Sequence, residues 1–273
     1  QWNGSGWTEI TDINTARNDL GGLKGGGTIT DALVFGGINR SGPTTYASTE
    51  FWDGSSWTEV SDLSTARYGG SGSGTSSAAL YAAGNTGSRV GISEEWSAPS
   101  DFNQIHEGQL FFNSTANAFK ETITDIPGAT WASAPNLNTA GTNGAGGTFG
   151  TQTAAITFAG DRPTRSVIAE QFNGSSWTEV GDLSTGRNNL GGAGTSTSAI
   201  GFGGGTPSYT GATEEWNNTS WSEEADLNQV RQVTGAGVSN SSALACAGYD
   251  PSAVTGKTEE WDGSSWTEIA DMN

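Results

Sequence analysis

The sequence predicts an all-β protein that is built from one repeated unit of four short strands. A tryptophan in the phrase SWTEV, or in a variant of it, recurs along the 273 residues with successive spacings of 50, 74, 46, 44 and 45 residues. These tryptophans are Trp7, Trp57, Trp131, Trp177, Trp221 and Trp266. The chain also contains 42 glycines but only 33% hydrophobic residues. Because glycine weakens a helix by ~1 kcal/mol per position, this composition favours many short strands.

Residues 187–224 show what one period contains. The segment NLGGAGT is rich in glycine, so it suits a strand that passes close to another backbone. SAIGFGG is a short apolar run that ends in two glycines, and GATEEWN and SWSEE are joined by a polar link that is typical of a hairpin. Four strands in ~45 residues is the size of one blade of a β-propeller. The repeat therefore predicts a ring of four-stranded blades.

The order of residues within the period resembles the kelch repeat. An arginine is followed by a strand that ends in Gly-Gly, then by a glutamate and an aromatic residue, then by a tryptophan and a turn of the form DL-S/N-T-A-R. The clearest copies contain Arg187, Gly203-Gly204, Glu215-Trp216 and Trp221, and Arg231, Ala247-Gly248, Glu260-Trp261 and Trp266. The sequence of the repeat is similar in particular to that of kelch-like proteins of marine phages and bacteria. This resemblance implies one kelch-like β-propeller over residues 1–273, with four-stranded blades at six or seven positions, one of them irregular.

Residues 97–130 interrupt the repeat. Within them, GQLFFNSTANAFKETI contains two apolar-aromatic runs around a polar turn, which predicts a hairpin. Two interpretations are open: the segment is a degenerate three-stranded blade completed by Trp131, or it is a hairpin inserted between the third and fourth strands of one blade. The choice decides whether the ring has six or seven positions. Similar hairpins are frequent in phage tail and fibre proteins, which favours a viral surface.

Two sets of residues recur for reasons of packing. Tryptophans of the fourth strand can each bury on the order of 200 Å², so we expect them to fill the space between neighbouring blades. They are Trp57, Trp177, Trp221 and Trp266. The repeated arginines are Arg17, Arg67, Arg187 and Arg231. We expect each guanidinium to reach a glutamate of the third strand or backbone carbonyl groups; the alternative is a ring of arginines that grips an anionic sugar.

Residues 1–10 repeat the third and fourth strands of a blade without a first and second strand of their own. An exposed strand edge of this kind invites pairing with another chain. The candidate pairing residues are Gln1, Trp2, Trp7, Thr8, Glu9 and Ile10. Three outcomes are open: the polypeptide continues past Asn273 and supplies the missing strands, the pair docks on the irregular blade, or it completes a neighbouring copy in a head-to-tail filament.

Groups able to carry out catalysis are scarce. His106 is the only histidine and no GxSxG motif occurs, which argues against a Ser-His-Asp relay and against metal sites built from several histidines. Cys246 lies in an apolar stretch and is expected to be a small buried side chain. Adjacent glutamates such as Glu94-Glu95 recur with the repeat, so we expect one of each pair to bond within the blade. The sequence therefore predicts neither an enzyme nor a cofactor or metal site.

Charge and hydropathy limit the partners. Eleven basic residues against 29 acidic residues give a net charge of −18, which repels nucleic acid and anionic membranes. No stretch approaches the ~18 apolar residues of a membrane span, so we expect no membrane insertion. The first residue is Gln1 rather than Met, as expected if a leader is removed or if the sequence begins inside a longer precursor. Together these features favour an extracellular protein or a protein of the virion surface.

The segments between the second and third strands differ among the periods while the framework repeats, as expected of loops that carry recognition. Examples are NTGSRVGIS, DRPTRSVIA and YDPSAVTGK. The candidate recognition residues are Arg89, Arg162, Arg165, Tyr209, Tyr249 and Lys257. The leading hypothesis is a non-catalytic adhesin or scaffold whose partner is a host-surface protein or glycan. The alternatives are a subunit of an extracellular filament that pairs strands with other copies and, less favoured, a glycan-cleaving enzyme.

Overall fold

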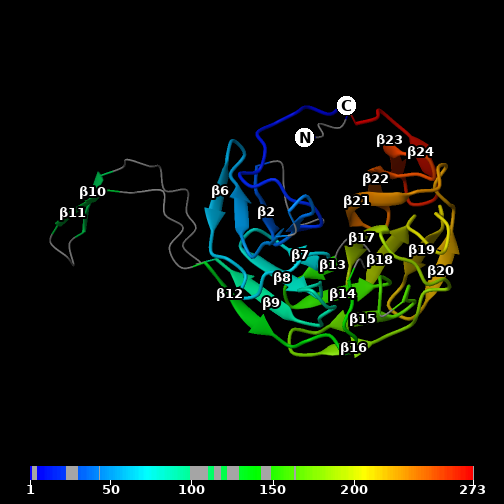
Figure 1. The fold of residues 1–273 in the computed structure, drawn as a ribbon, viewed down its shortest axis with the longest axis horizontal. Helices are drawn as coiled ribbons and strands as arrows, with labels where there is room; N and C mark the ends of the chain where they lie inside the picture. Colours follow the sequence, from blue (N-terminus) through cyan, green and yellow to red (C-terminus); the bar gives the residue numbers. More distant parts are fainter. Residues whose placement is uncertain are drawn as a thin grey trace.

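Five four-stranded antiparallel sheets surround a common centre as the blades of a β-propeller (Figure 1). The computed structural model describes residues 1–273 except 2–4, 23–29, 43, 99–109, 114–117, 122–128, 143–148, 163 and 273. Of residues 110–113, 118–121, 234 and 236–238 it describes the backbone alone. All regular elements of the described residues are strands, and none of these residues belongs to a helix that could cross a lipid bilayer.

Each blade runs in chain order from its first, innermost strand to its fourth, and successive strands pair. The first blade contains β1 (Gly21–Gly22), β2 (Ala32–Phe35), β5 (Thr49–Trp52) and β6 (Trp57–Val60). The second contains β7 (Ser71–Gly74), β8 (Ala78–Ala82), β9 (Ser93–Ser97) and β12 (Thr130–Ala134). The third contains β13 (Phe149–Thr151), β14 (Ala154–Phe158), β15 (Ala169–Phe172) and β16 (Trp177–Glu179).

The fourth blade contains β17 (Gly191–Thr195), β18 (Ser198–Phe202), β19 (Thr213–Trp216) and β20 (Trp221–Glu224). The fifth contains β21 (Gln232–Ser239), β22 (Ser242–Tyr249), β23 (Val254–Trp261) and β24 (Trp266–Glu268). Two short hairpins stand beside these sheets: β3 (Ile38–Asn39) pairs with β4 (Thr44–Thr45), and β10 (Leu110–Asn113) pairs with β11 (Ala118–Glu121).

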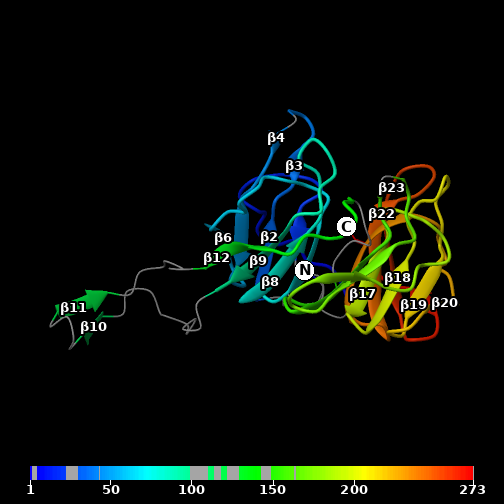
Figure 2. The same ribbon diagram turned by 90° about the horizontal axis from the view of Figure 1, so that it is seen from below.

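The sequence-based expectation of six or seven blade positions is wrong: the described residues form five blades. The reason lies in the irregular segment. After β9 the chain forms the separate hairpin β10–β11 and returns as β12, which pairs with β9 from Thr130 opposite Ser97 to Ala134 opposite Ser93. The hairpin therefore lies between the third and fourth strands of one blade and adds no blade. Figures 1 and 2 show β10 and β11 outside the ring.

Glycines of the first strands let neighbouring backbones approach each other at the centre. The first strands lie side by side in the order β1, β7, β13, β17 and β21. A Cβ atom on Gly72 of β7 would lie 2.6 Å from the carbonyl oxygen of Gly22 in β1 and 2.6 Å from Cζ of Phe35. Both distances are far below van der Waals contact, so only glycine fits this position.

Two residues with positive φ follow the second strand in the first four blades, and in the fifth blade they lie near the end of β22. The first of the two is Gly36, Ala83, Ala159, Gly203 or Ala247, with φ between 53° and 66°. Alanine adopts this left-handed conformation at a modest cost, which is why the first glycine of the repeat is replaceable. The second is always glycine: at Gly248 φ is 122°, and a Cβ atom would lie 1.9 Å from the carbonyl oxygen of Gln232.

Apolar clusters fill the wedges between neighbouring blades. Between the first and second blades, Leu33 and Phe35 of β2 pack with Tyr81 of β8, and the Phe35 and Tyr81 ring centroids are 4.9 Å apart. Between the fourth and fifth blades, Phe202 of β18 packs on Trp266 of β24 with a centroid separation of 4.7 Å. Each blade therefore buries its faces only against its neighbours, and stability is shared around the ring.

At the start of the chain, Gln1 and Thr8 pair with each other, and we call this strand pair the amino-terminal hairpin. The backbone N–H of Thr8 donates to the carbonyl oxygen of Gln1 at 2.8 Å, and the amino group of Gln1 donates to the carbonyl oxygen of Thr8 at 2.7 Å. The indole N–H of Trp57 donates to the carbonyl oxygen of Thr11 at 3.1 Å, which attaches the segment after this hairpin to β6. The two ends of the chain lie near each other between the first and fifth blades (Figure 1).

Trp177→Ala is expected to lower the free energy of unfolding by about 3–5 kcal/mol, the usual cost of removing a buried indole. The side chain is 5% exposed, its ring centroid lies 5.0 Å from that of Phe172, and its N–H donates to the carbonyl oxygen of Pro135 at 3.0 Å. Urea denaturation followed by circular dichroism measures the change. Trp177→Phe keeps an aromatic ring in the wedge, so it should lower the free energy of unfolding by clearly less than Trp177→Ala. A loss below about 1 kcal/mol for Trp177→Ala would contradict this packing.

Candidate functional site

A buried ion pair between an arginine and a third-strand glutamate recurs in every blade. In four blades the arginine ends the linker, the segment that leads into the first strand. The pairs are Arg17–Glu50 (3.0 Å), Arg67–Glu94, Arg187–Glu214 (3.0 Å), Arg231–Glu259 (2.5 Å) and, in the third blade, Arg162–Glu170 (2.8 Å). All of these side chains are almost fully buried. Buried charges need this kind of pairing and hydrogen bonding to be tolerated.

The same glutamate holds the linker in place. In the second blade the backbone N–H of Ser64 donates to Oε2 of Glu94 at 2.7 Å, while the N–H of Leu63 donates to the carbonyl oxygen of Ala47 in the first blade at 3.0 Å. The linker is therefore attached to the blade it leaves and to the blade it enters. The equivalent N–H groups of Asn14, Asn138, Ser184 and Asn228 donate to Glu50, Glu170, Glu214 and Glu259 at 2.6–2.8 Å.

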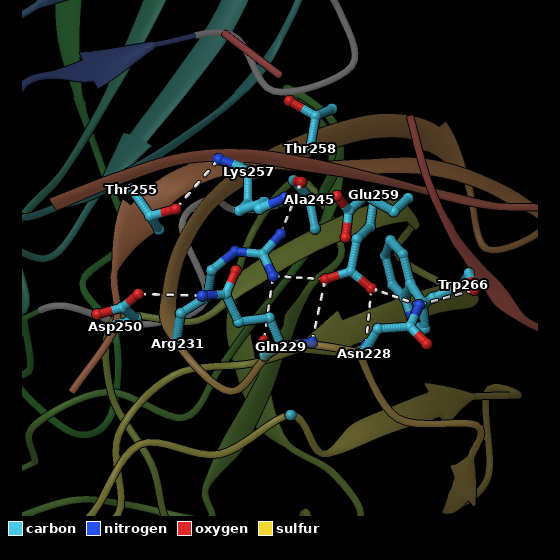
Figure 3. A network of polar contacts seen from close by, with 12 residues as sticks. Asn228, Gln229, Arg231, Ala245, Asp250, Thr255, Lys257, Thr258, Glu259 and Trp266 are labelled. Carbon is cyan, nitrogen blue, oxygen red and sulfur yellow. Dashed lines mark hydrogen bonds and ion pairs between the residues drawn. The ribbon is translucent and has the colours of Figure 1, made fainter. Parts of the chain in front are cut away.

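Figure 3 shows the complete network in the fifth blade. Arg231 donates from Nη2 to the carbonyl oxygen of Ala245 at 3.0 Å, in addition to its ion pair with Glu259. The side-chain amide of Asn228 donates to Oε2 of Glu259 at 2.8 Å and to the carbonyl oxygen of Trp266 at 2.9 Å. Arg231, Glu259 and Asn228 thus join the linker to the second, third and fourth strands.

The repeat arginines do not form a surface for an anionic sugar. Burial lowers the pKa of Arg187, and the negative charge of Glu214 counteracts this shift. The Arg187 side chain is fully buried and also donates to the carbonyl oxygens of Gly201 and Gly203. A guanidinium that is enclosed by its own blade cannot reach a ligand, so the sugar-binding alternative is wrong. The expectation that these arginines reach glutamates or carbonyl groups is confirmed for Arg17, Arg67, Arg187 and Arg231.

The third blade obtains its arginine from a different place in the sequence. Gly141 stands where the other linkers have arginine, and Arg162 reaches in from the segment after β14. Arg162 donates to Glu170 at 2.8 Å and to Oγ1 of Thr157 at 3.3 Å. A Cβ atom on residue 141 would lie 2.5 Å from Cγ of Arg162, so a side chain there and Arg162 exclude each other. The prediction that Arg162 belongs to a recognition surface is therefore wrong, because its side chain is buried.

Other predicted recognition residues do lie on one face of the ring, which we call the loop face. It consists of the segments between the second and third strands. Isolated bridges join Asn85 to Arg89, Asp161 to Arg165 and Gly205 to Tyr209, so Arg89, Arg165 and Tyr209 occupy equivalent positions in three successive blades. Arg89 and Arg165 are exposed and Tyr209 is half-buried. The framework thus presents a different side chain at one fixed position in each blade.

Side chains of neighbouring blades contact each other on the loop face. The ring of Tyr209 in the fourth blade meets that of Tyr249 in the fifth, edge to face, with centroids 6.2 Å apart, and Tyr249 is 45% exposed. The side-chain amide of Asn188 donates to both carboxylate oxygens of Asp161 at 3.1 Å, which connects the fourth blade to the third. The Asp161–Asn188 contact was not predicted, because it joins side chains from two different repeats.

Lys257 does not belong to a loop, contrary to the prediction. It lies within β23, and its ammonium group contacts Glu268 at 2.5 Å and Asp271 at 3.5 Å. The side-chain hydrogen bond to Glu268 raises the pKa of Lys257, with a smaller contribution from the charge of Asp271. Lys257 is therefore a half-exposed member of a salt-bridged cluster at the outer side of the fifth blade.

The residues predicted to pair with another chain are placed only in part. Gln1 and Thr8 pair with each other, Trp7 is half-buried, and Glu9 and Ile10 are exposed. Trp2 lies outside the described residues, as does His106. Of the repeat tryptophans, Trp177 and Trp266 are buried, whereas Trp57 and Trp221 are half-buried.

The described residues contain no group of three or more histidine, cysteine, aspartate or glutamate side chains that could hold a metal ion. The first glutamate of each repeated pair, such as Glu94 or Glu214, is occupied by its arginine and a backbone N–H. The second glutamates have other surroundings: Glu95 is half-buried, so burial raises its pKa, and Glu215 accepts a hydrogen bond from Asn240.

No protein-family model matches this chain, and a search of curated proteins found no match.

Arg162→Ala is expected to lower the free energy of unfolding by about 3–5 kcal/mol, because it leaves the buried carboxylate of Glu170 without its cation. Gly141→Arg in the same chain should recover most of that loss, since it restores the arginine at the position that the other linkers use. Urea denaturation of the three variants and the unchanged protein measures both effects.

Gly141→Arg alone is the control, and it should destabilise the protein because the new side chain and Arg162 compete for one space. If the double variant is no more stable than Arg162→Ala, Arg162 is not the substitute for the missing linker arginine.

Proposed function

We propose that the chain is a kelch-type propeller that acts as a non-catalytic binding module, with the loop face contacting a host-surface protein or glycan. The setting that we propose is extracellular or on a virion surface. The observation that carries the proposal is the contrast between the two parts of each blade. The arginines and glutamates of the framework bind each other, whereas one equivalent position of the loop face carries Arg89, Arg165 and Tyr209 in turn. Variation on a constant framework is expected of recognition.

Three features support the kelch-type assignment. The period combines a linker arginine, a diglycine end of the second strand and a third-strand glutamate, and each has a physical role. The arginine and glutamate neutralise each other inside the blade, and the second glycine adopts a backbone conformation that a side chain would obstruct. The repeat is thus held by interactions within each blade, whatever the loops carry.

The chemistry of the loop face favours a ligand with hydroxyl and anionic groups. The net charge of −18 repels anions at long range, but Arg89 and Arg165 are exposed guanidinium groups that can pair with an anionic group at short range. Tyr209 and Tyr249 add an aromatic pair with one exposed member, and such rings supply contact area together with a hydrogen-bonding hydroxyl. An acidic glycan or an acidic segment of a protein offers the matching groups.

Of the alternatives, a glycan-cleaving enzyme receives no support from the described carboxylates, whose repeated members bond within the blades. The second candidate function, a subunit of an extracellular filament that assembles by strand pairing, is favoured by one specific observation. Among the described residues, Val34, Leu244 and Met272 are more exposed than their counterparts in the other blades, so apolar surface remains between the fifth and first blades.

Arg89→Ala and Arg165→Ala together are expected to weaken binding to acidic glycans or to host cells at least ten-fold, each lost charge-assisted contact contributing about 1–3 kcal/mol. Binding of labelled protein to a glycan array and to cells measures the effect. Lys257→Ala is the matched control, because it removes a basic residue at the outer side of the fifth blade and should leave binding unchanged. Equal binding by all variants would count against the loop face as the contact surface.

A further inference from the structure

The second strands of the blades are not buried to the same degree. In the second, third and fourth blades, the four core residues of this strand, 79–82, 155–158 and 199–202, are all buried. In the first blade Ala32 and Val34 are only half-buried, and in the fifth blade Leu244 and Cys246 are half-buried. The expectation that Cys246 is buried is therefore not met, and the reason lies in what surrounds it.

The half-buried residues face the space between the fifth and first blades. Neighbouring residues of a strand point to opposite faces of the sheet. Leu33 and Phe35 pack on the second blade, so Ala32 and Val34 point away from it. Ala243 and Ala245 pack on Phe202 of the fourth blade, so Leu244 and Cys246 point away from that blade.

Met272, in the segment that follows the fifth blade, is also more exposed than its counterparts in the other blades. Its backbone N–H donates to the carbonyl oxygen of Gly256, as the N–H of Leu227 donates to that of Gly211 one blade earlier, so the two side chains are equivalent. The four leucines at this position, Leu63, Leu137, Leu183 and Leu227, are 4%, 6%, 3% and 5% exposed. Met272 is 37% exposed. The side chain at this position is therefore clearly more exposed after the fifth blade than after the other four blades.

Among the described residues, the first strands of the first and fifth blades make less contact with each other than the other neighbouring first strands do. From β1 to β21 each first strand packs on the next, but among the described residues β21 and β1 share no contact of comparable extent. Figure 1 shows that the first and fifth blades, which contain the start and the end of the chain, are neighbours in the ring. We call the surface formed by Ala32, Val34, Leu244, Cys246 and Met272 the open wedge.

The amino-terminal hairpin indicates which strands would complete the open wedge. Gln1 and Thr8 pair as Phe51 and Thr58 pair in the third and fourth strands of the first blade. Thr11 accepts the indole N–H of Trp57, as other linkers accept the indole N–H of the following blade. The amino-terminal hairpin therefore corresponds to the pairing of a third and a fourth strand, and the elements that every complete blade adds inside these two are a first and a second strand.

We propose that the open wedge is a binding site for a two-stranded β segment with the pattern of this chain's own first and second strands. The occupant has a glycine-rich first strand, because first strands approach a neighbouring backbone as closely as Gly72 approaches Gly22. Its second strand carries alternating apolar residues, because Val34 on one side and Leu244 on the other offer apolar surface. Such a segment covers both half-buried faces at once and supplies the missing contact between β21 and β1.

The test uses a labelled peptide with the sequence of residues 187–204, which comprises the first and second strands of the fourth blade, and fluorescence anisotropy with the whole protein. We expect saturable binding at one peptide per protein and a raised melting temperature. Val34→Lys and Leu244→Lys place a charge on the wedge at half-exposed positions, so they should fold and should weaken binding at least ten-fold. Val254→Lys, at a 78% exposed position outside the wedge, should not.

A peptide of the same composition in shuffled order is the second control, and it should not bind saturably. Binding that is absent, or that is equal for Val34→Lys, Leu244→Lys and the unchanged protein, overturns the proposal. Sedimentation that shows concentration-dependent oligomers dissolved by Val34→Lys also overturns it, because a second copy then covers the wedge, as the filament alternative requires. Arg89→Ala should leave peptide binding unchanged, which keeps this result independent of the loop face.

Discussion

The buried arginine–glutamate pair is the interaction on which the architecture depends. A blade of four short strands has little internal core, so its position is fixed by the linker and by the wedges on either side. The glutamate of the third strand accepts both the guanidinium and a linker N–H, as Glu94 does from Arg67 and Ser64. The preceding leucine returns to the earlier blade, as Leu63 does to Ala47. One polar network thus sets the angle between consecutive blades, and apolar side chains fill the resulting wedge.

The third blade shows that the constraint concerns a place in space rather than a place in the sequence. The linker arginine is replaced by Gly141, yet a guanidinium still reaches the third-strand glutamate because Arg162 enters from the neighbouring loop. Without an arginine, Glu170 would be a buried carboxylate with no cation beside it, which is energetically costly. The ion pair is therefore kept, although a different part of the sequence supplies the arginine. The same exchange removes one basic residue from the loop face and leaves Arg165 there.

The sequence predicted the features that repeat and missed those that depend on a neighbour. Regular tryptophans, the glycine-rich segment, the short apolar run that ends in two glycines and the polar hairpin link predicted four-stranded blades, because each is local to one period. The number of blades could not be predicted, because no pattern in residues 97–130 indicates that Thr130 pairs with Ser97 across an inserted hairpin. The burial of Arg162 depends on the absence of a side chain at residue 141, and the half-buried state of Leu244 depends on a facing strand. Strand pairing and burial of this kind depend on two segments that are distant in the sequence, so neither segment alone predicts them.

Amide hydrogen exchange at two equivalent serines tests most directly whether the third-strand glutamate holds the linker. Ser64 and Ser184 each donate a backbone N–H to such a glutamate, at 2.7 Å to Glu94 and 2.8 Å to Glu214. In Glu214→Gln, which keeps the shape but removes the charge, the account predicts exchange at Ser184 about ten-fold faster or more, with Ser64 unchanged. Equal protection of the two amides in this variant would contradict the account.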